Sequence, residues 1–359
     1  FINSKGVIMK KELLMGTALL STLGAASVAQ AVDVTMSGNH QTGVEFDSPS
    51  GGTDTNAQIN DNNFTVSLSA MNDSGVTISS SFKVMDENTK EDYDAGFTLA
   101  FESGAKLDLL NAGNSAGGHA VSIPGSAGAE GVANTSTNQA PTGLDFMTGS
   151  TALGVEFHTA SDFLADGLKL SVSLSTDTGA DATTTYRTDS HYGIGATYVT
   201  DLGGGSLTLG GGYTETDGSI SSGTAPNDDN GGMNVGISFT NNADNPLTVA
   251  VGFADGSKAG LTDNGSDEMT ADVVKAGVKY VTGDLTFNVG IASGEADDHA
   301  NGTTTSGSKD AQDVTSASVT VKLADGINGI LGYTATASSD EGAASDDGSA
   351  WYIGANMSF

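Results

Sequence analysis

The sequence predicts an all-β fold, a sixteen-stranded antiparallel barrel that crosses a membrane. First, sixteen segments alternate apolar and polar residues with the period of two that is typical of strands with unlike faces. Second, short turns and long loops alternate between these segments, as they do in membrane barrels. Third, the final segment places five apolar residues on one face and ends in an aromatic residue: Trp351, Ile353, Ala355, Met357 and Phe359.

Residues 9–31 have the features of a secretory signal peptide. Lys10 and Lys11 precede an apolar stretch, and Ala29-Gln30-Ala31 supplies a small-x-small cleavage site before Val32. The stretch is too short, and too often interrupted by Gly, Ser and Thr, for a retained transmembrane helix. We therefore expect an upstream extension at 1–8, a signal peptide at 9–31 and one transmembrane barrel domain at 32–359.

The composition excludes several classes of protein and partner. There is no Cys, so neither a disulfide framework nor a thiolate metal site can form. Removing the leader takes away three lysines and one acid, which leaves 10 basic and 43 acidic residues and a net charge of −33. So acidic a surface repels nucleic acid, and we expect no nucleic-acid partner.

The sixteen predicted segments are spread over the whole mature chain. They span residues 33–46, 63–70, 76–84, 93–101, 105–110, 151–158, 168–175, 192–199, 207–213, 233–240, 247–253, 273–281, 285–291, 317–323, 327–335 and 351–359. Of the 22 Phe, Tyr and Trp residues, 17 lie in the apolar phase, where membrane barrels carry aromatic girdles. The opposite phase is too polar for a packed interior, so we expect it to line a water-filled lumen.

An even number of strands places both ends of the barrel domain on the side of the short turns. The first and last strands then pair, which removes the sheet edges that lipid cannot satisfy. We expect Val32 and Phe359 to meet at this rim, where the α-amino group and the carboxylate would form an ion pair.

The chain also resembles a known family along essentially its whole mature length. The residues that carry the resemblance are the opening segment from Val32 to Gly38, the segment from Asn63 to Val84, a long third loop and the terminal Phe359. They resemble those of the sixteen-stranded general porins of the Gram-negative outer membrane, of the alphaproteobacterial, Rhodobacter-like type. The resemblance implies short periplasmic turns, long outer loops and a third loop, residues 111–148 here, that folds into the lumen as a constriction loop.

The same resemblance implies a function and a set of partners. A general porin is a water-filled channel for the passive diffusion of small hydrophilic solutes and ions, without catalysis or cofactor. It is a homotrimer in the outer membrane, where it contacts lipid and lipopolysaccharide. The last strand, with Trp351 and Phe359, resembles the assembly signal that the barrel-assembly machinery reads.

Charged residues of the lumen phase and of the third loop are the candidates for a pore constriction. Porins of this family set loop acids against an Arg cluster, whereas the single Arg of this chain, Arg187, lies in a predicted outer loop. Six lysines occupy the lumen phase instead: Lys83, Lys106, Lys169, Lys275, Lys279 and Lys322. The candidate constriction residues are Glu130, Asp145, Lys83, Lys106, Asp108, Asp94 and Glu156. The alternative is that the lysines are only hydrated wall charges; in either case we expect weak cation selectivity.

His40 breaks the pattern of the oily face in the first segment. It lies between Gly38 and Thr42, where contact with hydrocarbon would be costly. One interpretation is a partly hydrated His. The other is a trimer interface at Gly38, His40 and Thr42, because porins of this family associate through their first strands.

No motif predicts catalysis or a confident metal site. Gly113 to Gly117 matches the nucleophile-elbow pattern, but that motif requires a helix after it and a loop of Gly, Ala and Asn provides none, so we expect no enzyme. The five His residues are too scattered for a zinc site. Acids of the outer loops are candidate Ca²⁺ ligands: Asp263, Asp267, Glu268, Asp297 and Asp298. The alternative is a solvated, self-repelling surface.

Two rival functions fit parts of the sequence. A secreted acidic structural or adhesive protein, of the Ca²⁺-binding β-roll or surface-layer type, would also be rich in Gly and lack Cys. It would carry Gly-Gly-x-Gly-x-Asp repeats, which are not present. A substrate-specific outer-membrane channel would line its lumen with aromatic residues, but only Tyr352 falls clearly in that phase.

Overall fold

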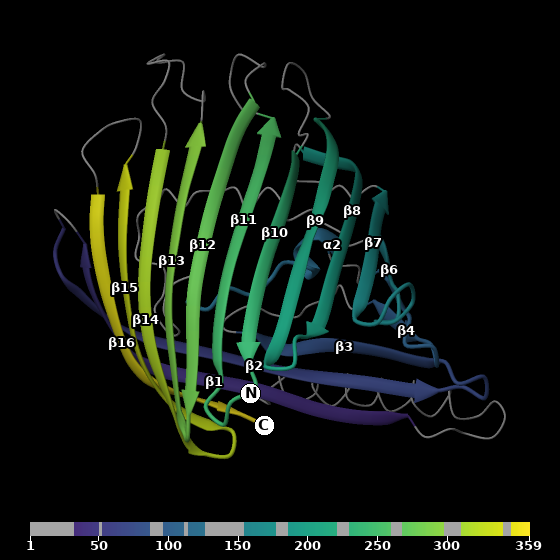
Figure 1. Cartoon of the computed structure of the whole chain (residues 1–359), viewed down its shortest axis with the longest axis horizontal. Coiled ribbons are helices and arrows are strands. Elements are labelled where there is room, and N and C mark those ends of the chain that lie inside the picture. The colour runs from purple at the N-terminus through teal and green to yellow at the C-terminus, as the bar shows by residue number, and fades with distance from the viewer. Residues whose placement is uncertain are drawn as a thin grey trace, which may run out of the picture.

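Sixteen antiparallel strands form one closed barrel in sequence order (Figure 1). The computed structural model describes residues 32–49, 52–86, 96–110, 114–125, 154–176, 186–220, 230–259, 268–297, 310–339 and 346–359. Strand β1 pairs with β2 on one side and with β16 on the other, which closes the sheet. The predicted fold class is therefore confirmed.

The strands follow the predicted segments one for one, and most are longer than predicted. Their bounds are β1 Asp33–Pro49, β2 Thr55–Met71, β3 Thr77–Asp86, β4 Phe97–Ala100, β5 Lys106–Leu109, β6 Gly154–His158, β7 Leu168–Thr176, β8 Tyr186–Asp201, β9 Gly205–Ile220, β10 Asn230–Asn241, β11 Leu247–Ala259, β12 Glu268–Thr282, β13 Leu285–Asp297, β14 Asp310–Ala324, β15 Ile327–Ser339 and β16 Asp346–Ser358. The extra residues lie mostly at the ends away from the short turns, so the barrel wall continues into segments that were assigned to outer loops.

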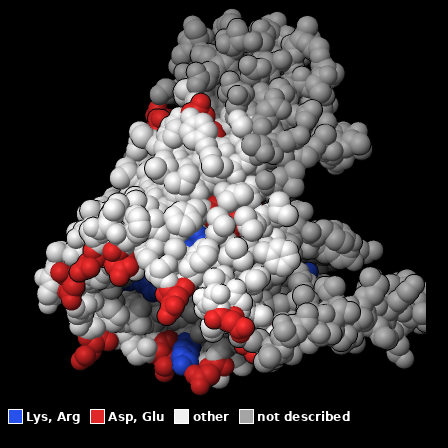
Figure 2. All heavy atoms as spheres, turned by 90° about the vertical axis from the view of Figure 1, so that its right-hand side faces the viewer, with Lys and Arg blue, Asp and Glu red and all other residues white. Residues whose placement is uncertain are grey.

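The barrel wall carries apolar side chains on its outer face and polar side chains on its inner face, the reverse of a soluble protein. In β7, Val172 and Leu174 are 42% and 57% exposed, while the neighbouring Ser171 and Ser173 are buried. The same alternation recurs in the other long strands, with apolar side chains outward and short polar side chains inward. In Figure 2 most charged atoms gather in the lower part and a smaller acidic group lies at the upper end, with a broad surface of mostly uncharged residues between them. An apolar outer surface of this kind suits hydrocarbon, not water.

Short turns join each even-numbered strand to the next strand. At Asn72 the side-chain Oδ1 accepts hydrogen bonds from the backbone N–H groups of Ser74 and Val76, and Gly75 takes the positive φ of 77° that closes the turn. An acid lies in or beside each of these turns: Asp73, Glu102, Asp162, Asp166, Asp201, Asp244, Asp284 and Asp325. The short-turn rim is therefore acidic.

Aromatic pairs lie near both ends of the outer wall. Tyr280 and Phe287 stack beside a short turn, with ring centroids 6.5 Å apart. Tyr333 and Trp351 pack at 4.4 Å toward the long-loop end of β15 and β16. Two bands of outward aromatic rings agree with the predicted girdles, which sit at the level of lipid headgroups.

The seam between β1 and β16 differs from the expected one. The backbone N–H of Gly38 donates to the carbonyl oxygen of Phe359 and that of Phe359 donates to Gly38, each at 3.2 Å. Val32 lies six residues before Gly38, about 20 Å along a strand at the usual rise. The predicted meeting of Val32 and Phe359 is therefore wrong. The first residues of β1 instead extend beyond β16 and pair with β2 alone, from Asp33 opposite Ser69.

Two glycines of β1 receive aromatic rings at this seam. On the outer face, a Cβ at Gly38 would lie 2.6 Å from the ring of Phe359, whose centroid is 6.3 Å from that of Phe64. On the inner face, a Cβ at Gly43 would lie 2.5 Å from the ring of Tyr352, which is fully buried. Each ring thus occupies the space that a side chain on β1 would need.

The described residues contain one helix, α2 (Ser115–Gly118), in the connection between β5 and β6. Within this part of the chain, no helix is both long and apolar enough to span a membrane.

Deletion of Phe359 tests the seam. The deletion removes both backbone hydrogen bonds to Gly38 and the ring that covers Gly38, so we expect a sharp fall in the amount of heat-modifiable barrel in the outer membrane. Ser358→Ala, which changes only an exposed hydroxyl, is the matched control and should leave that amount unchanged. Equal amounts of folded barrel from the deletion and the control would contradict the role of this contact.

Candidate pore constriction

Residues 114–125 of the third loop lie inside the barrel against its wall. Helix α2 contacts β7, β8, β9 and β10, and Figure 1 places it within the ring of strands, behind β8 and β9. The chain then runs on to Pro124 and Gly125, which lie against β12 and β13. The expectation of an inward-folded third loop is confirmed for this described part.

Polar contacts fasten α2 to the wall. Asn114 caps the helix, its Oδ1 accepting from the N–H groups of Ala116 and Gly117 at 3.0 and 3.4 Å. The backbone N–H of Ser115 donates to Ser173 Oγ at 3.1 Å, and its hydroxyl donates to Glu156 Oε1 at 2.8 Å. On the other side, Asn234 Nδ2 donates to the carbonyl of Ala116 at 2.8 Å. These bonds satisfy the helix ends that burial would otherwise leave unpaired.

A row of glycines on six successive strands makes room for this segment. A Cβ at Gly195 would lie 2.2 Å from the carbonyl oxygen of Ser115, and one at Gly277 would lie 2.0 Å from that of Pro124. The row consists of Gly195 on β8, Gly210 and Gly212 on β9, Gly236 on β10, Gly252 on β11, Gly277 on β12 and Gly290 on β13. We call these residues the glycine track. These glycines were not among the predicted site residues, although glycine in the inward phase of successive strands is a signal that the sequence contains.

Charged groups gather on the wall where β5 and β6 pair. Asp108 lies opposite Glu156 and Lys106 lies opposite His158 in the β5–β6 register. The His158 Nε2 atom is 3.0 Å from Asp108 Oδ2 and 3.8 Å from Glu156 Oε2. Among the described residues, Asp108, Glu156 and His158 form the one group of three potential metal ligands, with ligand atoms within 4.8 Å of one another. We call these three residues the wall cluster.

A line of hydrogen bonds connects the wall cluster to the loop. Ser171 Oγ lies 2.6 Å from His158 Nδ1 and 2.6 Å from His119 Nε2. The other nitrogen of His119, Nδ1, lies 2.7 Å from Thr197 Oγ1. Burial lowers the pKa of His119, and the positive charge of Lys169 lowers it further, so its ring is neutral at pH 7. The five His residues were expected to be too scattered for a zinc site, but His119 and His158 lie on either side of one serine.

The predicted constriction residues are only partly brought together. Asp108 and Glu156 are neighbours beside α2, and Lys106 is adjacent but exposed. Lys83 lies on β3, two strands away from Asp108. The predicted residues Glu130, Asp145 and Asp94 lie outside the described residues, as do the Ca²⁺ candidates Asp263, Asp267 and Asp298. The backbones of Glu268, Asp297 and Arg187 belong to strands, although Arg187 was expected in an outer loop.

The predicted trimer-interface residues form a polar stripe on the outer wall. His40 Nδ1 contacts Asn62 Oδ1, and Thr42 Oγ1 donates to Asn60 Oδ1 at 2.7 Å. Gly38 continues the same outward face, beneath the ring of Phe359. The neighbouring outward residues are apolar, so this stripe on β1 and β2 is poorly suited to hydrocarbon.

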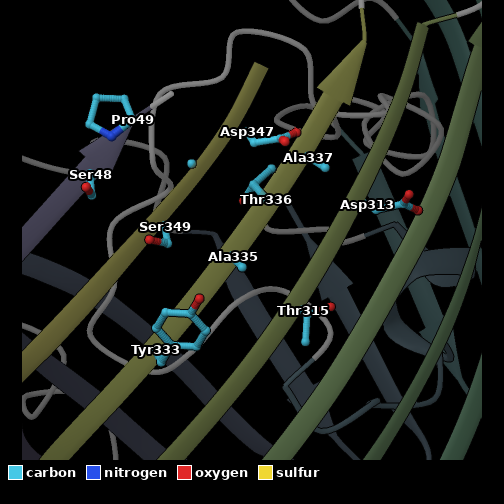
Figure 3. A pocket seen from close by; sticks show the side chains of 11 residues that line it. Ser48, Pro49, Asp313, Thr315, Tyr333, Ala335, Thr336, Ala337, Asp347 and Ser349 are labelled. Carbon is cyan, nitrogen blue, oxygen red and sulfur yellow. The ribbon is translucent and has the colours of Figure 1, made fainter. Parts of the chain in front are cut away.

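A second hollow lies near the long-loop ends of β14, β15, β16 and β1 (Figure 3). It has a volume of about 560 Å³, and the small side chains of Ala335 and Ala337 leave the space open. Asp313 and Asp347 flank it, and Tyr333 lies below them. Tyr333 packs against the outward Trp351, so the hollow opens on the outer face of the wall, whereas residues 114–125 lie on the inner face; we do not assign it to the constriction.

Solved structures of other proteins share this fold. The outer membrane channel DcaP of Acinetobacter baumannii matches with a TM-score of 0.63 at 11% identity, covering 91% of this chain and 97% of that chain. A solved porin gives a TM-score of 0.59 at 13% identity, covering 91% and 100%. OmpT, an outer membrane protein of Vibrio cholerae in a trimer form, gives 0.58 at 10% identity, covering 92% and 100%.

Neither a family model nor a curated protein matches the sequence. At these identities the likeness concerns the fold, which is the porin-like fold of an outer-membrane channel.

The glycine track can be tested by adding one methyl group. Gly277→Ala forces a Cβ to within 2.0 Å of the carbonyl oxygen of Pro124, so the loop must shift away from the wall. We expect the free energy of unfolding to fall by about 1–3 kcal/mol, as for overpacked interiors, in a denaturant titration of the detergent-solubilised protein. The control is Gly231→Ala, whose Cβ would meet nothing closer than 3.5 Å. Equal losses in both variants would show that residues 114–125 do not press on the wall.

Proposed function

We propose that the protein is an outer-membrane porin, a water-filled channel through which small hydrophilic solutes and ions diffuse passively. The observation that carries the proposal is the inverted polarity of a closed barrel, whose apolar side chains face outward and whose polar side chains face inward. Such a wall is stable only between hydrocarbon outside and water or polar groups inside. In this proposal the protein is not an enzyme and has no cofactor.

The loop segment on the glycine track narrows the channel in this proposal. Asp108 and Glu156 place two carboxylates on the lumen wall beside α2, with Lys106 next to them. Glu130, Asp145, Asp94 and Lys83 remain proposed members of the constriction, from the resemblance alone.

We propose a homotrimer in which the polar stripe with Gly38, His40 and Thr42 faces the neighbouring subunit. Burial between subunits removes His40 and Thr42 from lipid, where polar groups are costly. Outer-membrane lipid and lipopolysaccharide contact the rest of the apolar wall, and the barrel-assembly machinery recognises the last strand with Trp351 and Phe359.

We also propose the alphaproteobacterial, Rhodobacter-like type of general porin, on the sequence features of the first strands, third loop and terminal Phe359. The closed antiparallel barrel is incompatible with the rival β-roll fold. For the rival substrate-specific channel, the predicted aromatic lining residue was Tyr352. Its ring is fully buried over Gly43 and does not present a surface to solutes.

Reconstitution of the purified protein in a planar lipid bilayer tests the channel. We expect stepwise increases of conductance that occur in groups of three, because each inserted trimer carries three pores. A heat-unfolded sample of the same preparation is the control and should give no steps. Correctly folded protein that inserts without conducting would refute the channel.

The sign of ion selectivity is a separate expectation. Acids at the short-turn rim and in the outer loops concentrate cations at both mouths, whereas lumen lysines partly offset the wall carboxylates. Salt screens exposed charges beyond about 8–10 Å at physiological ionic strength, so the mouth contribution fades as salt rises. We expect a weak preference for cations that is stronger in dilute salt.

The zero-current potential across a KCl gradient, measured at two mean concentrations, tests this expectation. Preference for anions at low salt would mean that the lumen lysines dominate. Selectivity that does not change with salt would place the filter deep inside the pore.

A further inference from the structure

We propose that Asp108, Glu156 and His158 bind one divalent transition-metal ion, Zn²⁺, on the lumen wall. The three residues lie on two paired strands, β5 and β6, and offer two carboxylates and one imidazole. Imidazole nitrogen and carboxylate oxygen are both common zinc ligands in proteins.

The spacing of the ligand atoms fits a tetrahedral ion. Bonds of 2.0–2.2 Å from Zn²⁺ to nitrogen or oxygen place neighbouring ligand atoms about 3.4 Å apart. The two measured separations from His158 Nε2, 3.0 Å to Asp108 Oδ2 and 3.8 Å to Glu156 Oε2, lie on either side of this value. The third separation, between the two carboxylate oxygens, is at most 4.8 Å, so side-chain shifts of up to about 1 Å, on the order of thermal motion, complete three corners of the tetrahedron.

Each ligand is held from behind by a hydroxyl group. Thr98 donates to Asp108 Oδ1, and Ser115 donates to Glu156 Oε1 at 2.8 Å. Ser171 Oγ lies 2.6 Å from His158 Nδ1. In every case the partner contacts the ligand atom that does not face the ion. Contacts of this kind orient metal ligands in known sites, and they need a fixed arrangement of three separate elements, β4, α2 and β7.

The hydrogen-bond line supports the tautomer that an ion requires. Without the ion, His158 Nε2–H donates to Asp108. When the ion replaces that proton, His158 Nδ1–H donates to Ser171 Oγ, whose hydroxyl donates to His119 Nε2, and His119 Nδ1–H donates to Thr197. The single proton of the His158 ring moves from Nε2 to Nδ1, so no proton is released and every nitrogen in the line has one partner of the right kind.

The site is accessible and selects against hard cations. The side chains of His158 and Asp108 are 17% and 15% exposed, so one side of the cluster is open to lumen water, which supplies the fourth ligand. Ca²⁺ takes six to eight oxygen ligands at 2.3–2.6 Å, which this site does not provide. Lys106, opposite His158, is exposed to water.

Calorimetric titration of the folded, detergent-solubilised full-length protein with ZnCl₂, in excess Ca²⁺ to fill weak sites on acidic loops, tests the proposal. We expect one Zn²⁺ per chain, lost in His158→Gln and in Asp108→Asn. Ser171→Ala should weaken Zn²⁺ binding about 10–100-fold, because it removes the group that orients His158. Asp162→Asn is the matched control for Asp108→Asn, since Asp162 is an exposed acid in the short turn after β6 and lies outside the cluster, and it should bind Zn²⁺ like the wild type.

The proposal is overturned if the wild type binds no Zn²⁺ under these conditions, or if folded His158→Gln and Asp108→Asn bind it unchanged. A heat-dependent shift in electrophoretic mobility shows which variants are folded. Because the two ligand variants lie on different strands, the test still holds if one of them fails to fold.

The effect on the channel rests on the proposed function: bound Zn²⁺ cancels two negative charges and should lower the cation preference of the wild type but not of His158→Gln. Because calorimetry needs no conduction, a silent barrel that binds Zn²⁺ refutes only the channel, and a conducting barrel without Zn²⁺ refutes only the site.

Discussion

The hydrogen bonding between β1 and β16 is the constraint on which the rest of the structure depends. In hydrocarbon each unsatisfied backbone group costs several kcal/mol, so a spanning sheet must have no free edge. The closed sheet has an outer surface that faces hydrocarbon and an inner surface that faces water. The alternation of side chains along every strand follows from this separation, with exposed Leu174 and buried Ser173 as adjacent examples.

The inner surface of the barrel holds a second layer of backbone. Residues 114–125 approach β8 to β13 so closely that, at every position of the glycine track except Gly252, an added methyl group would lie within 2.7 Å of another atom. Polar anchors then fix the helix that begins the segment, through Ser115 on one side and Asn234 on the other. The wall cluster uses the same anchor, because Glu156 accepts from Ser115. The contact between Ser115 and Glu156 therefore fixes both the position of α2 and the position of one carboxylate of the wall cluster.

The strands and turns were predictable because their signals are local. A period of two and a turn such as Asn72 to Gly75 need no knowledge of distant residues. The wall cluster was not predictable, since it depends on the β5–β6 register and on contacts such as that of His119 with Ser171, 52 residues apart. The alternation along a strand shows which residues face outward, but it does not determine the register between that strand and its neighbour. The strand order was therefore predicted correctly, whereas the predicted meeting of Val32 with Phe359 was wrong.

The ring of Tyr352 over Gly43 fixes the register between β1 and β16 at the seam of the barrel. A slip of one residue between β1 and β16 would turn every side chain of one strand to the wrong solvent, so polarity already forbids it. A slip of two residues leaves every side chain on its original face, so polarity alone does not exclude it. It would, however, move the buried ring from Gly43 onto Gln41 or Glu45, whose side chains fill that space. The contact between Gly43 and Tyr352 therefore excludes a shifted register, and with it a barrel of different circumference, which the alternation of apolar and polar residues alone would allow.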